Sequence, residues 1–161
     1  MIKGAIKRNI RLTTATVTDT NRTTVLDTVP NTKMEVTNQL KRQVWEKGQK
    51  VDGFNPDMYR KDPCGAWIVW DKYGVQDSIY GWEIDHIFPQ ATLQEKGFSA
   101  ALIDDLRNLR PMQHENNASK SDDYPSYTAV VTSDDKKNIY KDASLTVNEA
   151  TRNLLAQLYK L

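Results

Sequence analysis

The sequence predicts a mixed α+β fold, and three observations lead to this prediction. Residues 66–70 and 82–87 gather β-branched and aromatic side chains, which is typical of strands. Residues 33–48 and 145–161 repeat apolar residues at helical spacing, so each predicts a helix with one buried face. The chain has 161 residues, a length that fits one domain or a small domain with an appended arm.

Charge is distributed unevenly along the chain. Residues 1–50 hold 10 Lys and Arg against 4 Asp and Glu, whereas residues 51–161 hold 12 against 17. A basic arm before an acidic body can approach a polyanion, although a solvated surface is the better interpretation of charge alone. We therefore treat residues 1–50 as a basic arm with a helix and residues 51–161 as the main domain.

Composition excludes several classes of protein. No apolar run reaches the roughly 18 residues of a membrane-spanning helix. Residues 1–11 also lack the continuous apolar stretch of a secretory signal. Cys64 is the only cysteine, which excludes an intrachain disulfide and a zinc site built from several thiolates. These features lead us to expect a cytoplasmic protein.

The N-terminal half begins with an arm and a helix. Residues 12–29 are rich in Thr and Val and suit a hairpin or an extended arm. Thr32 and Glu35 have the spacing of a capping box, so the first helix should begin near residue 33. Its apolar face consists of Val36, Leu40 and Val44. The strand candidates 66–70 and 82–87 could then form an antiparallel pair joined by a long loop.

The segment after these strands predicts two short helices. Ser99 suits the N-cap of a helix over residues 99–107. Pro111 suits the first position of another helix that runs to about Ser121, because proline is tolerated there. Residues 123–143 are polar and rich in Asp, and they predict a loop or an irregular strand.

The C-terminus predicts the clearest helix of the chain. Thr146 and Glu149 have the spacing of a second capping box. The apolar face of this helix consists of Val147, Ala150, Leu154, Leu158 and Leu161. We interpret this face as part of the hydrophobic core.

Residues 82–122 carry the chemistry of the sequence. Asp85 and His86 place a carboxylate beside an imidazole at a strand end, although neighbours on a regular strand point to opposite faces. They could flank one site if the strand bends or if a substrate atom lies between them. Asn117 and Lys120 share one helical face, where they offer an amide oxygen for a hard metal and an ammonium for phosphate. Two further donors of phosphate type are Arg107 and Arg110.

This stretch resembles the HNH endonuclease family, whose core is a ββα-metal unit. The resemblance covers residues 82–122 closely and residues 59–65 more loosely. The family motif is an Asp-His pair, an Asn that opens an Asn-Leu-x-Pro turn, a His or Asn nine residues later, and a Lys three residues after that. In this chain the matching residues are Asp85, His86, Asn108, Asn117 and Lys120.

The resemblance implies a role for each matching position. His86 would be the general base that activates water for attack on phosphorus. Asp85 and Asn117 would hold one divalent cation, Mg²⁺ or Mn²⁺, and Asn108 would pin the loop that orients His86. The implied protein is a bacterial or phage-encoded endonuclease acting on DNA, most simply double-stranded DNA. The residues beside its phosphates would be Arg107, Arg110 and Lys120.

Two features depart from the family pattern. Many relatives bind a structural zinc ion through two Cys-x-x-Cys pairs. Here Trp67 stands three residues after Cys64, and Gln113 and Asn116 stand at the positions of the second pair. We expect no structural zinc and a core held by packing, and residues 90–106 form an insert that can add a short helix. The packing residues would be Trp67, Trp70, Trp82 and those of the C-terminal helix.

Other interpretations compete with these. His86 could be a core histidine, Asp85 and Asn117 could be capping or turn residues, and Asn108 could simply close a turn. The chain could also be a non-catalytic nucleic-acid-binding module, or an assembly module, for instance of a phage particle, whose N-terminal arm docks onto a protein partner. The spacing of the complete motif makes the endonuclease the preferred interpretation.

Overall fold

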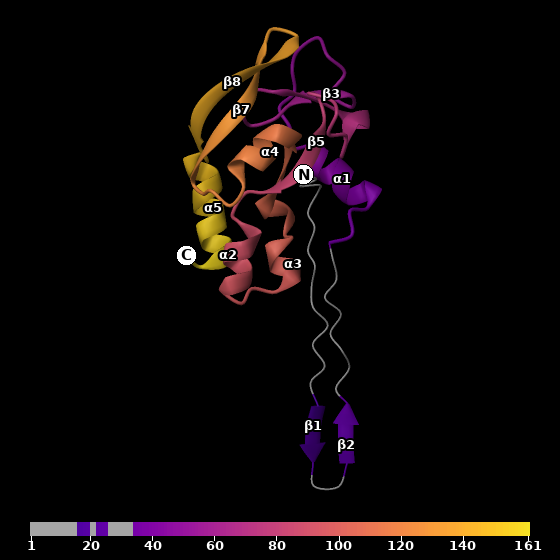
Figure 1. Cartoon of the computed structure of the whole chain (residues 1–161), viewed down its shortest axis with the longest axis vertical. Helices are drawn as coiled ribbons and strands as arrows, with labels where there is room; N and C mark the ends of the chain where they lie inside the picture. Colours follow the sequence, from indigo (N-terminus) through magenta and orange to yellow (C-terminus); the bar gives the residue numbers. More distant parts are fainter. Residues whose placement is uncertain (1–15, 20–21, 26–33) are drawn as a thin grey trace.

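The computed structural model describes residues 16–19, 22–25 and 34–161 (Figure 1). Within the threonine-rich arm, β1 (Thr16–Asp19) pairs antiparallel with β2 (Arg22–Val25), in agreement with the hairpin or extended arm expected there. The remaining residues up to 33 lie outside the described residues. The docking role expected of the arm rests largely on them and stays a prediction.

The first helix of the main body, α1 (Asn38–Trp45), begins later than predicted. The hydroxyl of Thr37 caps it by accepting from the backbone N–H of Leu40 at 3.1 Å. The capping box at Glu35 is wrong, because Thr37 offers its oxygen at the actual helix start and Glu35 lies in the non-helical segment before it. Val36 also precedes the helix, yet it packs against the core beside Leu40.

Within residues 34–161 the strands form three antiparallel pairs, and the pairing differs from the prediction. β3 (Tyr59–Lys61) pairs with β4 (Trp67–Val69), while β5 (Trp82–His86) pairs with β6 (Leu109–Gln113). A 3₁₀ turn, η1 (Trp70–Lys72), follows β4. The expected pair of residues 66–70 with 82–87 is therefore wrong, since β3 lies one short turn before β4 and satisfies its hydrogen bonds.

Pro111 lies within β6 and does not open a helix as predicted. Two backbone groups of β6 point away from β5 and bond to other parts of the chain. The Leu109 carbonyl accepts from Lys47 Nζ, and the Gln113 N–H donates to Asp62 Oδ2 at 3.1 Å. Alternate residues of a strand direct their backbone groups to the same side, so Pro111 also faces away from β5. Its missing N–H therefore removes no hydrogen bond between the two strands.

The insert between the strands contains two short helices, α2 (Gln90–Glu95) and α3 (Ala100–Ile103). Ser99 caps α3 as predicted, with its hydroxyl accepting from the Leu102 N–H at 3.3 Å. The helix ends earlier than the predicted residue 107, because Asp105 caps a separate 3₁₀ turn, η2 (Leu106–Asn108). Buried Leu93 and Ile103 fasten the insert to the core.

Helix α4 (His114–Lys120) follows β6 directly and lies between β5 and a long hairpin (Figure 1). The hairpin consists of β7 (Ser126–Asp134) and β8 (Lys137–Thr146), where we predicted a loop or an irregular strand. Tyr127, Ala129 and Val131 of β7 are buried at alternate positions, as a strand with one inward face requires. The polar residues that suggested a loop lie largely on the exposed face and at the hairpin tip.

The C-terminal helix, α5 (Glu149–Tyr159), has a different cap from the predicted one. The side chain of Asn148 accepts from the Thr151 N–H at 2.8 Å, while Thr146 still belongs to β8. Asn148 is the better cap here because the strand continues through Thr146 and leaves that hydroxyl too far upstream.

The buried face of α5 also differs from the prediction. Leu155 and Tyr159 are buried, whereas Leu154 and Leu161 are 40% and 54% exposed. Apolar residues at consecutive positions make the hydrophobic stripe wide, so its period could not decide which edge faces inward.

The β5–β6 sheet separates two hydrophobic clusters. On one side Ile84 and Leu109 join the rings of Trp45, Trp70 and Trp82, whose centroids lie 5.0 to 5.9 Å apart. The second cluster contains Met112 and α5 residues, so both faces of the short sheet are covered. Trp70 and Trp82 thus pack in the core as expected. No helix in the described part of the chain is long and apolar enough to cross a membrane.

Candidate active site

Asn108 anchors the loop that follows β5. Its side chain is fully buried; its amide oxygen accepts from the Phe88 N–H at 2.7 Å, and its amide nitrogen donates to the Phe88 carbonyl at 3.1 Å. The backbone carbonyl of Asn108 also accepts from the Ile87 N–H at 2.8 Å. These bonds fix the backbone directly after His86, where sequence analysis expected a pinned loop.

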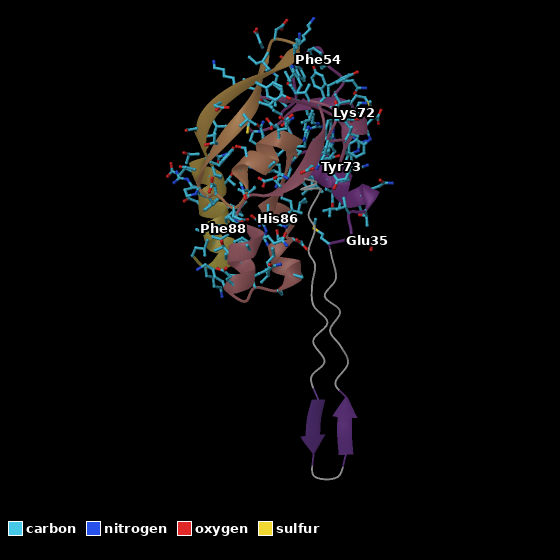
Figure 2. All side chains as sticks on the ribbon, viewed as in Figure 1. Glu35, Phe54, Lys72, Tyr73, His86 and Phe88 are labelled. Carbon is cyan, nitrogen blue, oxygen red and sulfur yellow. The ribbon has the colours of Figure 1, made fainter. Side chains whose placement is uncertain are left out.

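His86, which is labelled in Figure 2, ends β5. Its ring meets a carboxylate from the insert. Its Nε2 lies 2.8 Å from Oδ1 of Asp104, and the two side chains are 8% and 15% exposed. An imidazole that donates Nε2–H to a carboxylate keeps Nδ1 as its proton acceptor. The pair can therefore fix both the ring orientation and the tautomer of His86. Asp104 was not among the predicted site residues, because nothing in the sequence distinguishes it from Asp105 next to it.

Asp85 lies on the opposite face of β5 from His86, because the strand stays regular to its end. Its Oδ2 accepts from Nε of Arg110 at 2.8 Å across the strand pair, and its Oδ1 lies 3.3 Å from Nζ of Lys120. Asp85 is 3% exposed and Lys120 is fully buried. The carboxylate is thus held between two cations inside the protein.

The three predicted phosphate donors lie in different surroundings. Lys120 also donates to the His86 carbonyl at 3.1 Å, and Arg110 is 8% exposed. The Arg107 side chain is 50% exposed and binds the Asp105 carboxylate through two nitrogens, at 2.7 and 2.8 Å. This contact holds the pKa of Asp105 below its usual range. Of the three, Arg107 alone presents its charged group at the surface.

Helix α4 brings Asn117 against Glu83. Nδ2 of Asn117 donates to Oε2 of Glu83 at 2.9 Å, and Oε1 of Glu83 accepts from Gln76 at 3.1 Å. Glu83 and Asp85 share one face of β5 because they are two residues apart. This face therefore carries two carboxylates, and α4 adds the Asn117 amide and the Lys120 ammonium to it.

The oxygens on this face match a hard divalent cation in kind. Carboxylate and amide oxygens are the ligands that Mg²⁺ and Mn²⁺ take, and Glu83, Asp85 and Asn117 supply them. In the present arrangement Arg110 and Lys120 neutralise Asp85. Among the described residues, no group of three or more His, Cys, Asp or Glu is placed to hold a metal ion.

A buried carboxylate, Asp62, joins two segments in which the sequence lacks Cys-x-x-Cys pairs. Its Oδ1 accepts from the N–H groups of Cys64 and Ala66, at 2.8 and 2.9 Å. Its Oδ2 accepts from the Gln113 N–H and the Asn116 amide, each at 3.1 Å. Burial raises the pKa of Asp62. Hydrogen bonds around one side chain thus link the β3–β4 turn to β6 and α4.

Asn116 extends this network to the β7–β8 hairpin. Its amide oxygen accepts from the N–H groups of Val130 and Val131, and its amide nitrogen donates to the Val131 carbonyl, all at 2.8 Å. The expectation that packing alone holds the core is therefore incomplete. Burial also raises the pKa of the Cys64 thiol, which keeps it protonated and a poor metal ligand.

Lys47 lies beside the site at the outer edge of β6. Its ammonium donates to the carbonyl of Leu106 at 2.8 Å and to that of Leu109. Burial of the ammonium and repulsion from Arg110 lower the pKa of Lys47 from 10.5 to about 8. The sequence gives no sign of these contacts, since the partners of Lys47 are distant in the chain.

Comparison with known proteins gives one match. The family model for "GmrSD restriction endonucleases, C-terminal domain" matches residues 11–156, which include every site residue described above. No curated protein and no solved structure matches the chain. The matched description points to a nuclease-related family whose substrate is DNA.

Proposed function

The chain belongs to the family of C-terminal domains of GmrSD restriction endonucleases, and on this premise we propose that it hydrolyses phosphodiester bonds in DNA as an HNH-type endonuclease. The observation that carries this proposal is the fixed His86 at the end of β5. Asp104 binds its ring, and Asn108 pins the loop behind it. A histidine whose ring is held by a carboxylate partner suits general-base catalysis.

In the proposed reaction His86 takes a proton from a water molecule. The water oxygen forms a bond to phosphorus as the bond from phosphorus to the 3′ oxygen breaks, and the proton on His86 is later returned to solvent. Asp104 keeps Nε2 protonated during this step and stabilises the imidazolium that forms. General-base catalysis of this kind contributes about 10²- to 10⁴-fold to a rate.

We propose that Asp85 and Asn117 hold one Mg²⁺ or Mn²⁺ ion, with Glu83 beside them. Such an ion would neutralise charge on the scissile phosphate and the leaving oxygen. Lys120 and Arg110 hold Asp85 in place within the buried face. Because both are buried, we assign the phosphate contact to the exposed Arg107 and give Lys120 and Arg110 a positioning role.

Supercoiled-plasmid cleavage by the purified chain tests this proposal. The reactions contain Mg²⁺, Mn²⁺ or EDTA, and they run beside His86→Ala and the control Tyr140→Ala, whose side chain is exposed on β8. Nicking or linearisation that needs the metal and disappears only in His86→Ala supports the nuclease and its base. Cleavage that persists in His86→Ala contradicts the base assignment. An intact plasmid under every condition, together with retained DNA binding, favours the non-catalytic module.

A further inference from the structure

The outer face of the β3–β4 hairpin carries aromatic residues where a solvent-facing strand pair usually carries polar ones. The register pairs Tyr59 with Val69 and Lys61 with Trp67, so these four side chains share one face. The opposite face holds Arg60 and Ile68, which are 4% and 0% exposed. The core therefore takes one face of the hairpin. On the other face Tyr59 is 42% exposed, whereas Trp67 is 5% exposed and lies against Phe54.

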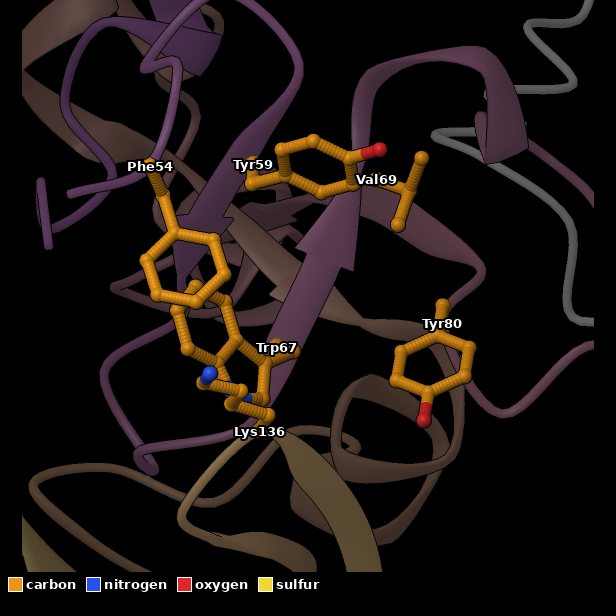
Figure 3. Close-up of a pocket in the computed structure, with 6 residues that line it drawn as sticks. All are labelled: Phe54, Tyr59, Trp67, Val69, Tyr80 and Lys136. Carbon is orange, nitrogen blue, oxygen red and sulfur yellow. The ribbon is translucent and has the colours of Figure 1, made fainter.

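This face lines a hollow of about 200 Å³ together with Phe54, Tyr80 and Lys136, which lie outside the two strands (Figure 3). The ring of Phe54 lies over Trp67 with centroids 4.6 Å apart, and Tyr59 stands at 76° to Phe54, 6.3 Å away. Tyr59 is 42% exposed, so its ring is accessible from outside. The hollow is lined by Phe54, Tyr59, Trp67, Val69, Tyr80 and Lys136.

The size of the hollow restricts what it can hold. Sites for drug-sized ligands usually measure about 300–1,000 Å³, so this hollow suits one small planar group rather than a helix or a long chain. Aromatic side chains at several angles offer such a group both a stacking surface and edge contacts.

Cations beside the hollow favour a planar group that carries a negative charge. Lys136 lines it, and Nζ of Lys61 lies 4.9 Å from the centroid of the Trp67 ring. Lys61 itself lines another pocket, of about 170 Å³, together with Lys47, Asp62 and Arg110. A planar group with an attached anion therefore finds aromatic rings in the hollow and the Lys61 ammonium against the Trp67 ring that lines it.

We propose that this hollow binds one unstacked nucleobase of the nucleic-acid substrate, with the adjoining phosphate at Lys61. Aromatic rings combined with cations along the backbone are how proteins hold unpaired bases. The base could come from a single strand or be turned out of a duplex. The proposal rests on the proposed function only in taking nucleic acid as the ligand, since binding at the hollow needs neither His86 nor the metal.

Fluorescence anisotropy in EDTA, with the full chain carrying His86→Ala, tests the hollow without cleavage of the probe. The probes are a labelled single-stranded oligodeoxynucleotide, the same strand annealed to its complement, and an abasic strand of equal length. Tyr59→Ala should weaken binding of the base-containing strand about 5- to 100-fold and leave the abasic strand unaffected. Lys61→Gln should weaken both strands and reduce the salt slope by about 0.7.

Tyr140→Ala serves as the control, because Tyr140 is 67% exposed and lies outside the hollow. Phe54→Ala is the second variant, and thermal melting checks that each variant is folded. The proposal would be overturned if Tyr59→Ala, Phe54→Ala and the parent bound the base-containing strand with equal affinity. It would also be overturned if the parent bound no strand. A dimer that depends on Tyr59 in sedimentation would overturn it as well, because the hollow would then be an interface between copies.

The duplex probe identifies the source of the base. If Tyr59→Ala weakens binding of both the duplex and the single strand, the base is turned out of the duplex. If it weakens binding of the single strand alone, the substrate is unpaired. Either result supports the hollow. Because the protein carries His86→Ala throughout, a failure of the plasmid-cleavage experiment leaves this result unaffected, and the reverse also holds.

Discussion

At the scale of single residues, the contact between His86 and Asp104 most directly connects structure with chemistry. The two atoms are 2.8 Å apart, and both side chains are mostly buried. A carboxylate in that position restricts the ring to one orientation and one tautomer, which a base needs before it can act on a bound water molecule. The insert that contains Asp104 therefore has a role in the proposed site.

Replacing Asp104 by Asn should lower kcat about 10- to 100-fold and change KM little, because the amide loses the charge that fixes the tautomer. Steady-state cleavage of a labelled duplex measures both constants. In the His86→Gly variant added imidazole should restore part of the activity, and it should not do so in Asp104→Asn. A KM effect as large as the kcat effect would argue against a positioning role for Asp104.

The lowered pKa of Lys47 predicts how the free energy of unfolding depends on pH. Its folded pKa is about 8, below the ordinary 10.5, so between these values the unfolded chain binds more protons than the folded chain. The contribution of Lys47 to the free energy of unfolding should therefore rise as pH increases from 8 to 10.5. Urea denaturation of the parent and of Lys47→Met across this range measures it, and the parent should gain stability relative to the variant. A constant difference would contradict the lowered pKa.

At the scale of elements, the β5–β6 pair and α4, which directly follows β6, build the face that carries Glu83 and Asp85. Asn116 hydrogen-bonds α4 to β7, as Ser119 also does, and Asp62 joins the Asn116 network from the β3–β4 turn. These are buried hydrogen bonds, and each group left without its partner costs about 1–3 kcal/mol. The polar network is thus expected to position α4, and with it Asn117.

Asn116→Ala should lower the free energy of unfolding by roughly 2–4 kcal/mol, because the N–H groups of Val130 and Val131 and the Asp62 carboxylate lose a partner. Chemical denaturation provides the measurement. Asn153→Ala on the exposed side of α5 is the matched control and should change stability by less than about 0.5 kcal/mol. Equal effects of the two substitutions would show that the network does not hold α4 to the hairpin.

At the scale of the whole molecule, the body consists of two hydrophobic clusters on either side of a two-stranded sheet, joined by the Asp62 network. No structural zinc is expected from its residues, and the Cys64 thiol is kept protonated by burial. A metal needed for catalysis should therefore be separable from the stability of the fold.

EDTA should abolish plasmid cleavage and leave the melting temperature of the chain unchanged. A structural zinc ion would behave differently, since such ions contribute about 10–16 kcal/mol to folding and chelators unfold the domains that need them. Differential scanning fluorimetry with and without EDTA makes this comparison. A clear drop in melting temperature would show that a metal holds the fold.

Sequence alone identified the motif residues, the strand that ends at His86, the Ser99 cap and the presence of helices near residues 40 and 150, because local spacing and capping chemistry encode these features. Only the tertiary structure decided the rest. It decided which strands pair with β4 and β5, that Pro111 lies in a strand, and which edge of α5 is buried. It also decided the contacts of His86 with Asp104 and of Asp85 with Lys120. These features depend on residues that are distant in the chain. Periodicity describes one element at a time, and the choice among several apolar faces or several carboxylates is made by packing between elements.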